Sequence, residues 1–175
     1  PPPSPAPGSR LFLGAGPVGL ATRDFVTLPG AQTIGLDRNE QRLEFCRTVM
    51  GVKHTIRLSD NVEPELRELT EGYLPDVVID ATGSNASMSN AFGYVAPGGR
   101  LVYVGITTEE VKFRHPVFHK TEGTLLCSRN ALPGDFTRII RLIEDGEIDT
   151  KPWITHRAAF DHLPAPFPSH TTPET

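Results

Sequence analysis

The sequence predicts an α/β fold, in which helices cover both faces of a doubly wound, parallel sheet of six strands. The first observation is the alternation of short apolar runs with helical patterns along most of the chain. The second is an apolar run at residues 10–13 that breaks into three glycines spaced as G-x-G-x-x-G. The third is Asp37, which ends the next strand-like run and follows Gly19 by 18 residues. Such features are typical of a sheet that binds a ligand at the carboxyl ends of its strands.

The glycine-rich stretch at residues 14–19 predicts a sharp turn from a buried strand into a helix. Gly14 allows the tight turn, and Gly16 lets the backbone approach a pyrophosphate without a side chain in between. Gly19 lets the new helix pack closely on the sheet. Pro17 suits the first turn of that helix, because its φ angle is fixed and it lacks an N–H. The free N–H groups at the helix N-terminus would then attract a phosphate.

Asp37 follows a second predicted strand at residues 32–36, after a predicted helix at about 17–28. An acid at this place binds the adenosine ribose hydroxyls in dinucleotide-binding sheets. A strand-end aspartate can also cap the next helix, predicted at 39–50, but the glycine turn favours ribose binding. The carboxylate would repel a 2′-phosphate, which favours NAD over NADP, although the adjacent Arg38 could accept that phosphate.

The rest of the chain continues the alternation of strands and helices. It predicts, in chain order, a strand at 54–56, a helix at 64–70, a strand at 75–80, a helix at about 86–94, a strand at 100–106, a short helix at 116–120, a sixth strand at 124–127 and a helix at 135–145. Such β-α-β units are right-handed and give a parallel sheet, for which we expect the strand order 3-2-1-4-5-6. The ligand would lie at the switch point between strands 1 and 4. This arrangement brings the glycine turn, Asp37, residues 81–83 and residues 104–106 to one crevice.

Composition limits the partners that the chain could have. Its 175 residues are 38% hydrophobic and 22% charged with a net charge of −4, as expected for one globular domain or a large fragment. There is no basic excess that would indicate nucleic acid or an anionic membrane. No apolar run is long enough to span a bilayer and no secretory signal is evident, which favours the cytoplasm. Cys46 and Cys127 are expected to be buried, without a disulfide between them.

Both ends of the chain are rich in proline. Five of the 17 prolines lie in the first seven residues, and four more lie in the last twelve. We therefore expect a linker at residues 1–9, a dinucleotide-binding domain at 10–163 and an extended tail at 164–175 that leads to a missing catalytic domain. The chain starts with proline and its first methionine is Met50, so we expect a fragment of a longer product.

The chain resembles the cofactor domain of the medium-chain, zinc-dependent alcohol and polyol dehydrogenases. The resemblance rests on four segments in matching order: LGAGPVG at 13–19, VIDATG at 78–83, PGGRLV at 97–102 and SRN at 128–130. It extends from about residue 8 to about residue 163, and it implies the Rossmann fold with NAD as the cofactor. It also implies hydride transfer from an alcohol, a polyol or a sugar acid, with zinc held only by the missing domain. The isolated chain would then bind NAD weakly and turn over nothing.

The resemblance implies contacts to the adenosine half of the cofactor. The backbone at 16–19 would contact the pyrophosphate, and Asp37 would contact the ribose. Arg42 matches a basic residue beside that ribose in the family. A solvated helix arginine is the other interpretation, but its place on the same helix side as Phe45 and Val49 favours the site.

The resemblance also implies contacts further along the cofactor. Residues 81–83 would follow its middle, 104–106 would hold the nicotinamide carboxamide, and Arg129 would reach the pyrophosphate or the substrate side. The predicted cofactor-binding residues are therefore Gly14, Gly16, Pro17, Val18, Gly19, Asp37, Arg38, Arg42, Ala81, Thr82, Gly83, Val104, Gly105, Ile106 and Arg129.

Neither a catalytic residue nor a metal ligand is predicted in this chain. His115 and His119 are four residues apart, but Pro116 disfavours a regular helix through both. No tyrosine is followed by a lysine four residues later, so the proton-transfer pair typical of short-chain dehydrogenases is missing.

Two other functions could use a similar crevice. A regulatory module that senses NAD(H) and signals to a partner would need no catalytic domain. A methyltransferase also uses a glycine turn and a strand-end acid, but the step from Gly14 to Gly19 with Pro17 inside it argues against one. The predicted partners are the small-molecule cofactor, the missing catalytic domain and a second copy of the chain, which would pair with the exposed edge of the strand at 124–127.

Overall fold

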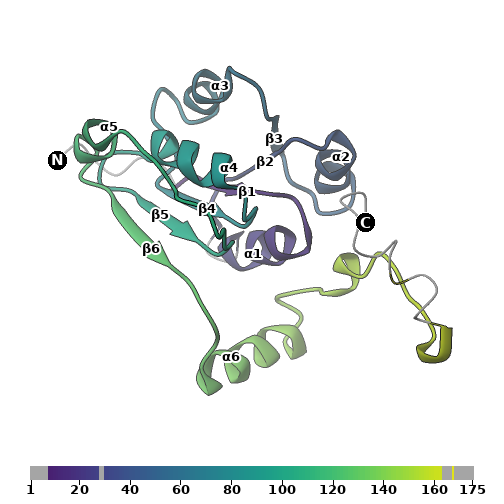
Figure 1. The fold of residues 1–175 in the computed structure, drawn as a ribbon. Coiled ribbons are helices and arrows are strands. Elements are labelled where there is room, and N and C mark those ends of the chain that lie inside the picture. The colour runs from purple at the N-terminus through teal and green to yellow at the C-terminus, as the bar shows by residue number, and fades with distance from the viewer. Residues whose placement is uncertain (1–7, 28–29, 163–166, 168–175) are drawn as a thin grey trace.

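Six parallel strands form a single sheet in the order β3-β2-β1-β4-β5-β6 (Figure 1). The strands are β1 (Arg10–Leu13), β2 (Thr33–Asp37), β3 (His54–Arg57), β4 (Val77–Asp80), β5 (Arg100–Tyr103) and β6 (Thr124–Cys127). The computed structural model describes residues 8–27, 30–162 and 167. Most of the predicted linker at 1–9 and nearly all of the predicted tail at 164–175 lie outside these residues. The sheet confirms the predicted fold class and strand order.

Helices pack on both faces of the sheet (Figure 1). The helical elements of the described residues are α1 (Pro17–Thr27), α2 (Glu40–Thr48), α3 (Val62–Leu69), α4 (Asn85–Asn90), η1 (Ala91–Tyr94), α5 (His115–His119), α6 (Pro133–Glu144), η2 (Lys151–Trp153) and η3 (Phe160–His162), of which α6 and η3 contribute nothing to the two cores. Side chains alternate along β1, so Leu11 and Leu13 join one core with Met88 of α4, whereas Phe12 joins the other with Cys46 of α2. Within the described part of the chain, no helix is long and apolar enough to cross a membrane.

The register of the central strands brings their carboxyl ends to one level. Leu13, the last residue of β1, pairs with Leu36 of β2 and with Asp80 of β4. Asp80 pairs in turn with Tyr103, the last residue of β5. The segments that follow these strands therefore leave the sheet at the same edge, which is where a doubly wound sheet binds ligands.

Two predicted elements differ in detail from those observed. The helix expected at 86–94 is the short helix α4 followed by the 3-10 turn η1. The strand expected at 100–106 stops at the end of β5. Beyond that point Val104 N and Gly105 N both donate to the carbonyl oxygen of Asp80 at 2.9 Å, so the chain turns away from the β6 ladder.

The helix α5 begins at His115 although Pro116 follows directly. A proline in the first helical turn is tolerated, because the N–H that it lacks would have no partner there. On its inner side, Phe118 packs edge-on against Phe92 with 5.0 Å between the ring centroids. The proline-based argument against a helix through both histidines was therefore wrong.

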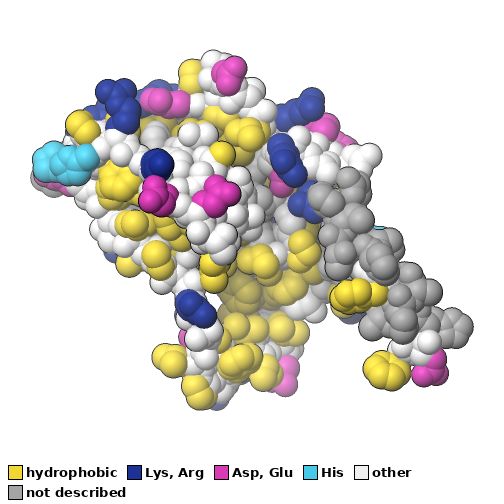
Figure 2. All heavy atoms as spheres, in the orientation of Figure 1, with side chains coloured by type: hydrophobic (Ala, Val, Ile, Leu, Met, Phe, Trp, Pro, Cys, Tyr) yellow, Lys and Arg dark blue, Asp and Glu magenta, His cyan; other side chains and the backbone are white. Residues whose placement is uncertain are grey.

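The strand β6 and the helix α6 expose apolar side chains. All four residues of β6 are exposed, so the prediction that Cys127 is buried was wrong, whereas Cys46 is buried as predicted. The helix predicted at 135–145 is confirmed as α6, but it projects from the sheet (Figure 1) and exposes Phe136, Ile140 and Ile143. Figure 2 shows hydrophobic side chains gathered over this helix and over the adjoining part of the body. These three apolar residues recur at helical spacing, and the structure leaves the face that they form exposed.

The segment after α6 returns to the helix α1. Ile148 is only 3% exposed, and the indole Nε1 of Trp153 donates to Asp24 Oδ2 at 2.8 Å. Trp153 therefore packs this segment against the body, whereas Ile154 is exposed.

Candidate functional site

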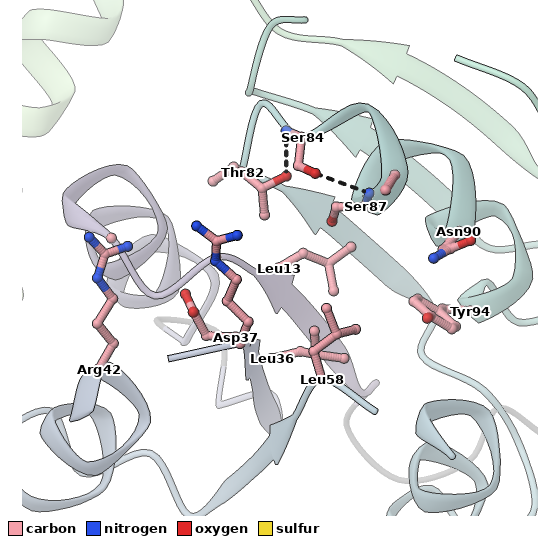
Figure 3. A pocket seen from close by; sticks show the side chains of 15 residues that line it. Leu13, Leu36, Asp37, Arg42, Leu58, Thr82, Ser84, Ser87, Asn90 and Tyr94 are labelled. Carbon is pink, nitrogen blue, oxygen red and sulfur yellow. Dashed lines mark hydrogen bonds between the residues drawn. The ribbon is translucent and has the colours of Figure 1, made fainter. Parts of the chain in front are cut away.

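A cavity of about 420 Å³ opens at the carboxyl ends of β1, β2 and β4 (Figure 3). It lies at the switch point that the strand order predicts, between β1 and β4. Seven of the residues predicted from the sequence line it: Gly14, Gly16, Asp37, Arg38, Arg42, Ala81 and Thr82. The fold therefore brings together residues from three segments that are far apart in the sequence, at 14–16, 37–42 and 81–82.

The three glycines of the first turn meet different constraints. Gly14 has a φ of +92°, and a Cβ there would lie 3.0 Å from Cγ2 of Thr82. At Gly19, a Cβ would lie 1.7 Å from the carbonyl oxygen of Gly14. Any other residue at this position would therefore prevent α1 from packing on the glycine turn. At Gly16, the nearest atom to such a Cβ would be Arg42 Nη1 at 3.5 Å. Gly16 thus faces open space on the side of the cavity. A residue at which a ligand approaches the backbone needs such space.

Asp37 ties the glycine turn to the end of β2. The residue is 8% exposed, and its Oδ2 accepts a hydrogen bond from Ala15 N at 2.7 Å. Its Oδ1 accepts another from Asn39 N at 2.7 Å. The cap of α2 is Asn39, whose side chain accepts from Gln41 N and Arg42 N, so the interpretation of Asp37 as the helix cap was wrong. In Figure 3, Asp37 and Arg42 approach the cavity from β2 and α2.

The loops after β4 and β5 touch each other through glycine backbones. A Cβ on Gly105 would lie 2.4 Å from Gly83 N, and a Cβ on Gly83 would lie 3.0 Å from the carbonyl oxygen of Ile106. Gly83 and residues 104–106 are therefore neighbours of the loop that lines the cavity, although they do not line it themselves.

The remaining predicted residues lie around the glycine turn or away from it. Pro17 lines a smaller neighbouring cavity of about 190 Å³, together with Trp153. Val18 is 52% exposed on α1. Arg129 is exposed in the segment after β6 and lines neither cavity. The structure does not bring Arg129 to the other predicted residues.

Eight residues line the cavity without having been predicted. They are Leu13, Leu36, Leu58, Ser84, Ala86, Ser87, Asn90 and Tyr94. Ser84 caps α4 by accepting a hydrogen bond from Ser87 N, so the capping serine marks where this helix begins beside the cavity. The residues farther along α4 and η1 are small or polar and carry no spacing that would identify a ligand contact.

Three groups near the cavity have raised pKa values. Burial, and next the charge of Asp37, raises the pKa of the Cys46 thiol to about 11. Burial, and next the charge of Glu63, raises the pKa of Tyr94. Burial, with a smaller effect from Asp80, also raises the pKa of Tyr103, whose hydroxyl donates to Met88 O at 2.5 Å. At neutral pH these groups keep their protons, and none of the three supplies a base or a thiolate.

The described residues hold no cluster of three or more His, Cys, Asp or Glu that could bind a metal ion. His115 and His119 face each other on α5 with 5.1 Å between the ring centroids, away from the cavity.

The residues around the cavity fit a nucleotide cofactor. Each oxygen of Asp37 already accepts one backbone N–H, and an ionised carboxylate has about four acceptor sites, so it can still accept from ribose hydroxyls. The helix α1 starts at the glycine turn with its N–H groups directed out of its N-terminus, where a phosphate is stabilised. Gly16 leaves room for that phosphate to approach.

Comparison with known protein families gives one match along most of the chain. The family described as zinc-binding dehydrogenase matches residues 17–145. Among curated proteins, L-galactonate-5-dehydrogenase of Escherichia coli K12 is 36% identical over 159 residues, which cover 90% of this chain and 47% of that protein. D-xylulose reductase of Scheffersomyces stipitis is 30% identical over 157 residues, which cover 85% of this chain and 43% of that protein. The chain thus spans about half the length of the curated relatives it matches.

Solved structures of alcohol dehydrogenases have the same fold. One from E. coli CFT073, determined in complex with NADH, superposes with a TM-score of 0.85 at 23% identity, over 96% of this chain and 50% of that one. Alcohol dehydrogenase TADH of Thermus sp. ATN1 superposes with a TM-score of 0.80 at 25% identity, over 93% of this chain and 48% of that one.

Proposed function

The chain belongs to the zinc-binding dehydrogenase family, and we propose that it is the NAD(H)-binding part of an enzyme that oxidises an alcohol, a polyol or a sugar acid. The observation that carries this proposal is the cavity at the switch point, where Asp37 and the glycine turn lie side by side. A nicotinamide cofactor is supported by the family match and by the NADH-bound structure with the same fold.

The proposed binding mode follows from the contacts around the cavity. The pyrophosphate would rest on the N-terminus of α1 beside Gly16. Asp37 would accept hydrogen bonds from the ribose hydroxyls while it keeps its bonds to Ala15 and Asn39. Arg42, which also lines the cavity, would lie near the phosphates or the ribose.

We further propose that this chain binds the cofactor and that another domain of the enzyme binds zinc and the substrate. When bound, the nicotinamide accepts a hydride from the substrate carbon. The residues of this chain would bind and orient the cofactor, while zinc and most of the substrate pocket would belong to the catalytic domain outside this chain. The 175-residue chain by itself is therefore expected to bind the cofactor without catalysing turnover.

The preference for NAD over NADP depends on the charge of Asp37. A carboxylate that binds the 2′-hydroxyl repels a 2′-phosphate. Arg38 also lines the cavity and would attract that phosphate, so the two side chains act in opposite directions. We expect NAD(H) to bind more tightly because Asp37 is held in place by two hydrogen bonds.

Calorimetric titration of the 175-residue chain tests this function. We expect NADH to bind with a Kd in the micromolar to millimolar range, and NADPH to bind more weakly. Equal or tighter binding of NADPH would overturn the choice of cofactor, and binding of S-adenosylmethionine without NADH would overturn the function itself. Alcohol oxidation by this chain alone would overturn the proposal that catalysis needs a domain outside it.

A second copy of the chain is the further partner in the proposal. The outer edge of β6 pairs with no strand among the described residues, and Leu125 and Leu126 are 41% and 45% exposed on it. An exposed apolar edge of this kind is a common route to symmetric dimers.

A further inference from the structure

Asp80 is a fully buried carboxylate at the end of β4. Its Oδ1 accepts hydrogen bonds from Thr82 N at 2.8 Å and from Thr82 Oγ1 at 2.6 Å. Its Oδ2 accepts one from Ser87 Oγ at 2.6 Å. All three partners donate, which suits an ionised carboxylate because that group can only accept. The side chain thus fixes both the loop after β4 and the helix α4.

The backbone of Asp80 fixes a second segment. Val104 N and Gly105 N both donate to its carbonyl oxygen at 2.9 Å. Gly105 in turn lies so close to Gly83 that a Cβ on Gly105 would be 2.4 Å from Gly83 N. The loop after β4 and the segment after β5 are therefore held by the same residue and touch each other.

The hydrogen bonds of Asp80 continue to the wall of the cavity. Thr82 Oγ1 donates to Asp80 and accepts from Ser84 N at 3.0 Å, and Ser84 caps α4. Thr82, Ser84 and Ser87 all line the cavity, as Figure 3 shows. A change at Asp80 would therefore move cavity residues without touching a ligand itself.

We propose that Asp80 is a positioning residue for the cofactor, which sets the spacing between the loop at residues 81–84 and the segment at 104–106. This inference rests on the proposed function, because these two segments would contact the middle and the nicotinamide end of the bound dinucleotide. Adenosine would be held mainly at Asp37, so an altered spacing affects the nicotinamide half of the cofactor more than the adenosine half.

Variants of the 175-residue chain test this role with NADH and AMP as ligands. Asp80→Ala removes every acceptor of the side chain and is expected to weaken NADH binding at least ~10-fold. AMP, which lacks the nicotinamide half, should lose less than about threefold. Asp80→Asn keeps an acceptor for Thr82, and the Ser87 hydroxyl can turn to accept from the new amide, so NADH affinity should return to within about threefold of the original. An equal loss for NADH and AMP in Asp80→Ala would overturn the proposal, as would an Asp80→Asn variant no better than Asp80→Ala.

Asp76→Asn is the matched control on the same strand segment. Asp76 accepts from Ser9 N at 2.9 Å, at the opposite end of β4 from the cavity. This variant should leave both affinities unchanged, and a loss selective for NADH here would overturn the role assigned to Asp80.

Thr82→Val and Thr82→Ser decide the question if Asp80→Ala does not fold. The valine has nearly the shape of threonine but cannot donate to Asp80, whereas the serine can. Thr82→Val should lower the affinity for NADH more than that for AMP, and Thr82→Ser, which keeps the donor to Asp80, should lose less NADH affinity than Thr82→Val. Equal behaviour of the two variants would overturn the proposal. If the unmodified chain binds neither ligand, the proposed function fails, and this inference fails with it.

Discussion

Asp37 has a structural and a proposed ligand-binding role at the end of β2. Its two oxygens accept from Ala15 N and Asn39 N, which joins the glycine turn, the strand and the start of α2. The same carboxylate lines the cavity. A substitution at this residue should therefore affect both the folding and the cofactor preference of the chain.

Asp37→Asn should separate these two roles. Asparagine keeps one acceptor oxygen but loses the charge, so we expect the free energy of unfolding to fall by about 1–2 kcal/mol. NADH binding should weaken about tenfold while NADPH binding changes less, because the repulsion of the 2′-phosphate is gone. Titration of both cofactors against the variant measures the ratio, with the exposed Asp60→Asn as the control. An unchanged ratio of the two affinities would contradict the role of Asp37 in cofactor choice.

The Cys46 thiol should make stability depend on alkaline pH. The thiol keeps its proton in the folded chain up to about pH 11, against about 9 for an unperturbed thiol. Its contribution is complete below about pH 9 and is lost as the pH rises to about 11, with an upper limit of about 2–3 kcal/mol. Urea unfolding over this range should show a steeper loss of stability for the original chain than for Cys46→Ala. Parallel curves would contradict a raised pKa.

Some residues of the site could be identified from the sequence because their positions have a strong local requirement. Gly14 and Gly19 are demanded by backbone geometry, and Asp37 by its place at a strand end. Ser87, Asn90 and Tyr94 reach the same cavity only because of how α4 and η1 pack on the sheet. The spacing of these three residues does not indicate how α4 and η1 pack, so their place in the cavity could not be predicted from the sequence.

The turn between β1 and α1 has two glycines that should respond differently to alanine. Gly19→Ala would put a Cβ 1.7 Å from the carbonyl oxygen of Gly14, so we expect a loss of more than about 4 kcal/mol or a failure to fold. Gly16→Ala meets its nearest atom only at 3.5 Å and should change stability by less than about 1 kcal/mol. Because the new methyl group occupies the approach to the pyrophosphate, NADH should bind at least about tenfold more weakly to Gly16→Ala.

Thermal unfolding and NADH titration of both variants measure these effects. A folded Gly16→Ala chain with unchanged NADH affinity would contradict the place assigned to the pyrophosphate. A stable Gly19→Ala chain would contradict the close packing of α1 on the turn.

Helical periodicity predicted that α6 exists, but not what it packs against. Its apolar residues recur at helical spacing, which is normally the sign of a buried face. Phe136 and Ile140 are instead 59% and 52% exposed. Periodicity describes only the helix itself, whereas burial depends on the surface that the rest of the chain presents to it.

At the scale of the whole molecule, the strand order follows from general rules. Right-handed β-α-β connections and the place of the glycine turn were enough to predict β3-β2-β1-β4-β5-β6. These rules act within one chain. They say nothing about whether the free edge of β6 is paired in solution, which depends on a second molecule.

Two proline variants of β6 should test the proposed dimer. Thr124 N donates to the carbonyl oxygen of Gly99, just before β5, and Ser128 N donates to that of Tyr103 at its end. By the alternation of a strand, the N–H of Leu126 therefore also faces β5 while that of Leu125 faces outward. Leu125→Pro should therefore leave the fold intact and convert a dimer to a monomer, whereas Leu126→Pro should destabilise the sheet itself. Sedimentation velocity distinguishes the species. A dimer that survives Leu125→Pro, or an unmodified chain that is monomeric at about 100 μM, a concentration at which a micromolar Kd would give mostly dimer, would contradict pairing through β6.

The hydrogen bond between Trp153 and Asp24 has an optical consequence. Trp153 is the only tryptophan of the chain, and it lines the small cavity on the outer side of the glycine turn, with Ala15, Gly16 and Pro17. Indole emits light in the band that a reduced nicotinamide absorbs. Binding of NADH should therefore quench the intrinsic fluorescence of the chain by energy transfer, whereas AMP should not, and Trp153→Phe should abolish the signal. Trp153, which one indole hydrogen bond holds in place, would then report binding of the proposed ligand without an added label.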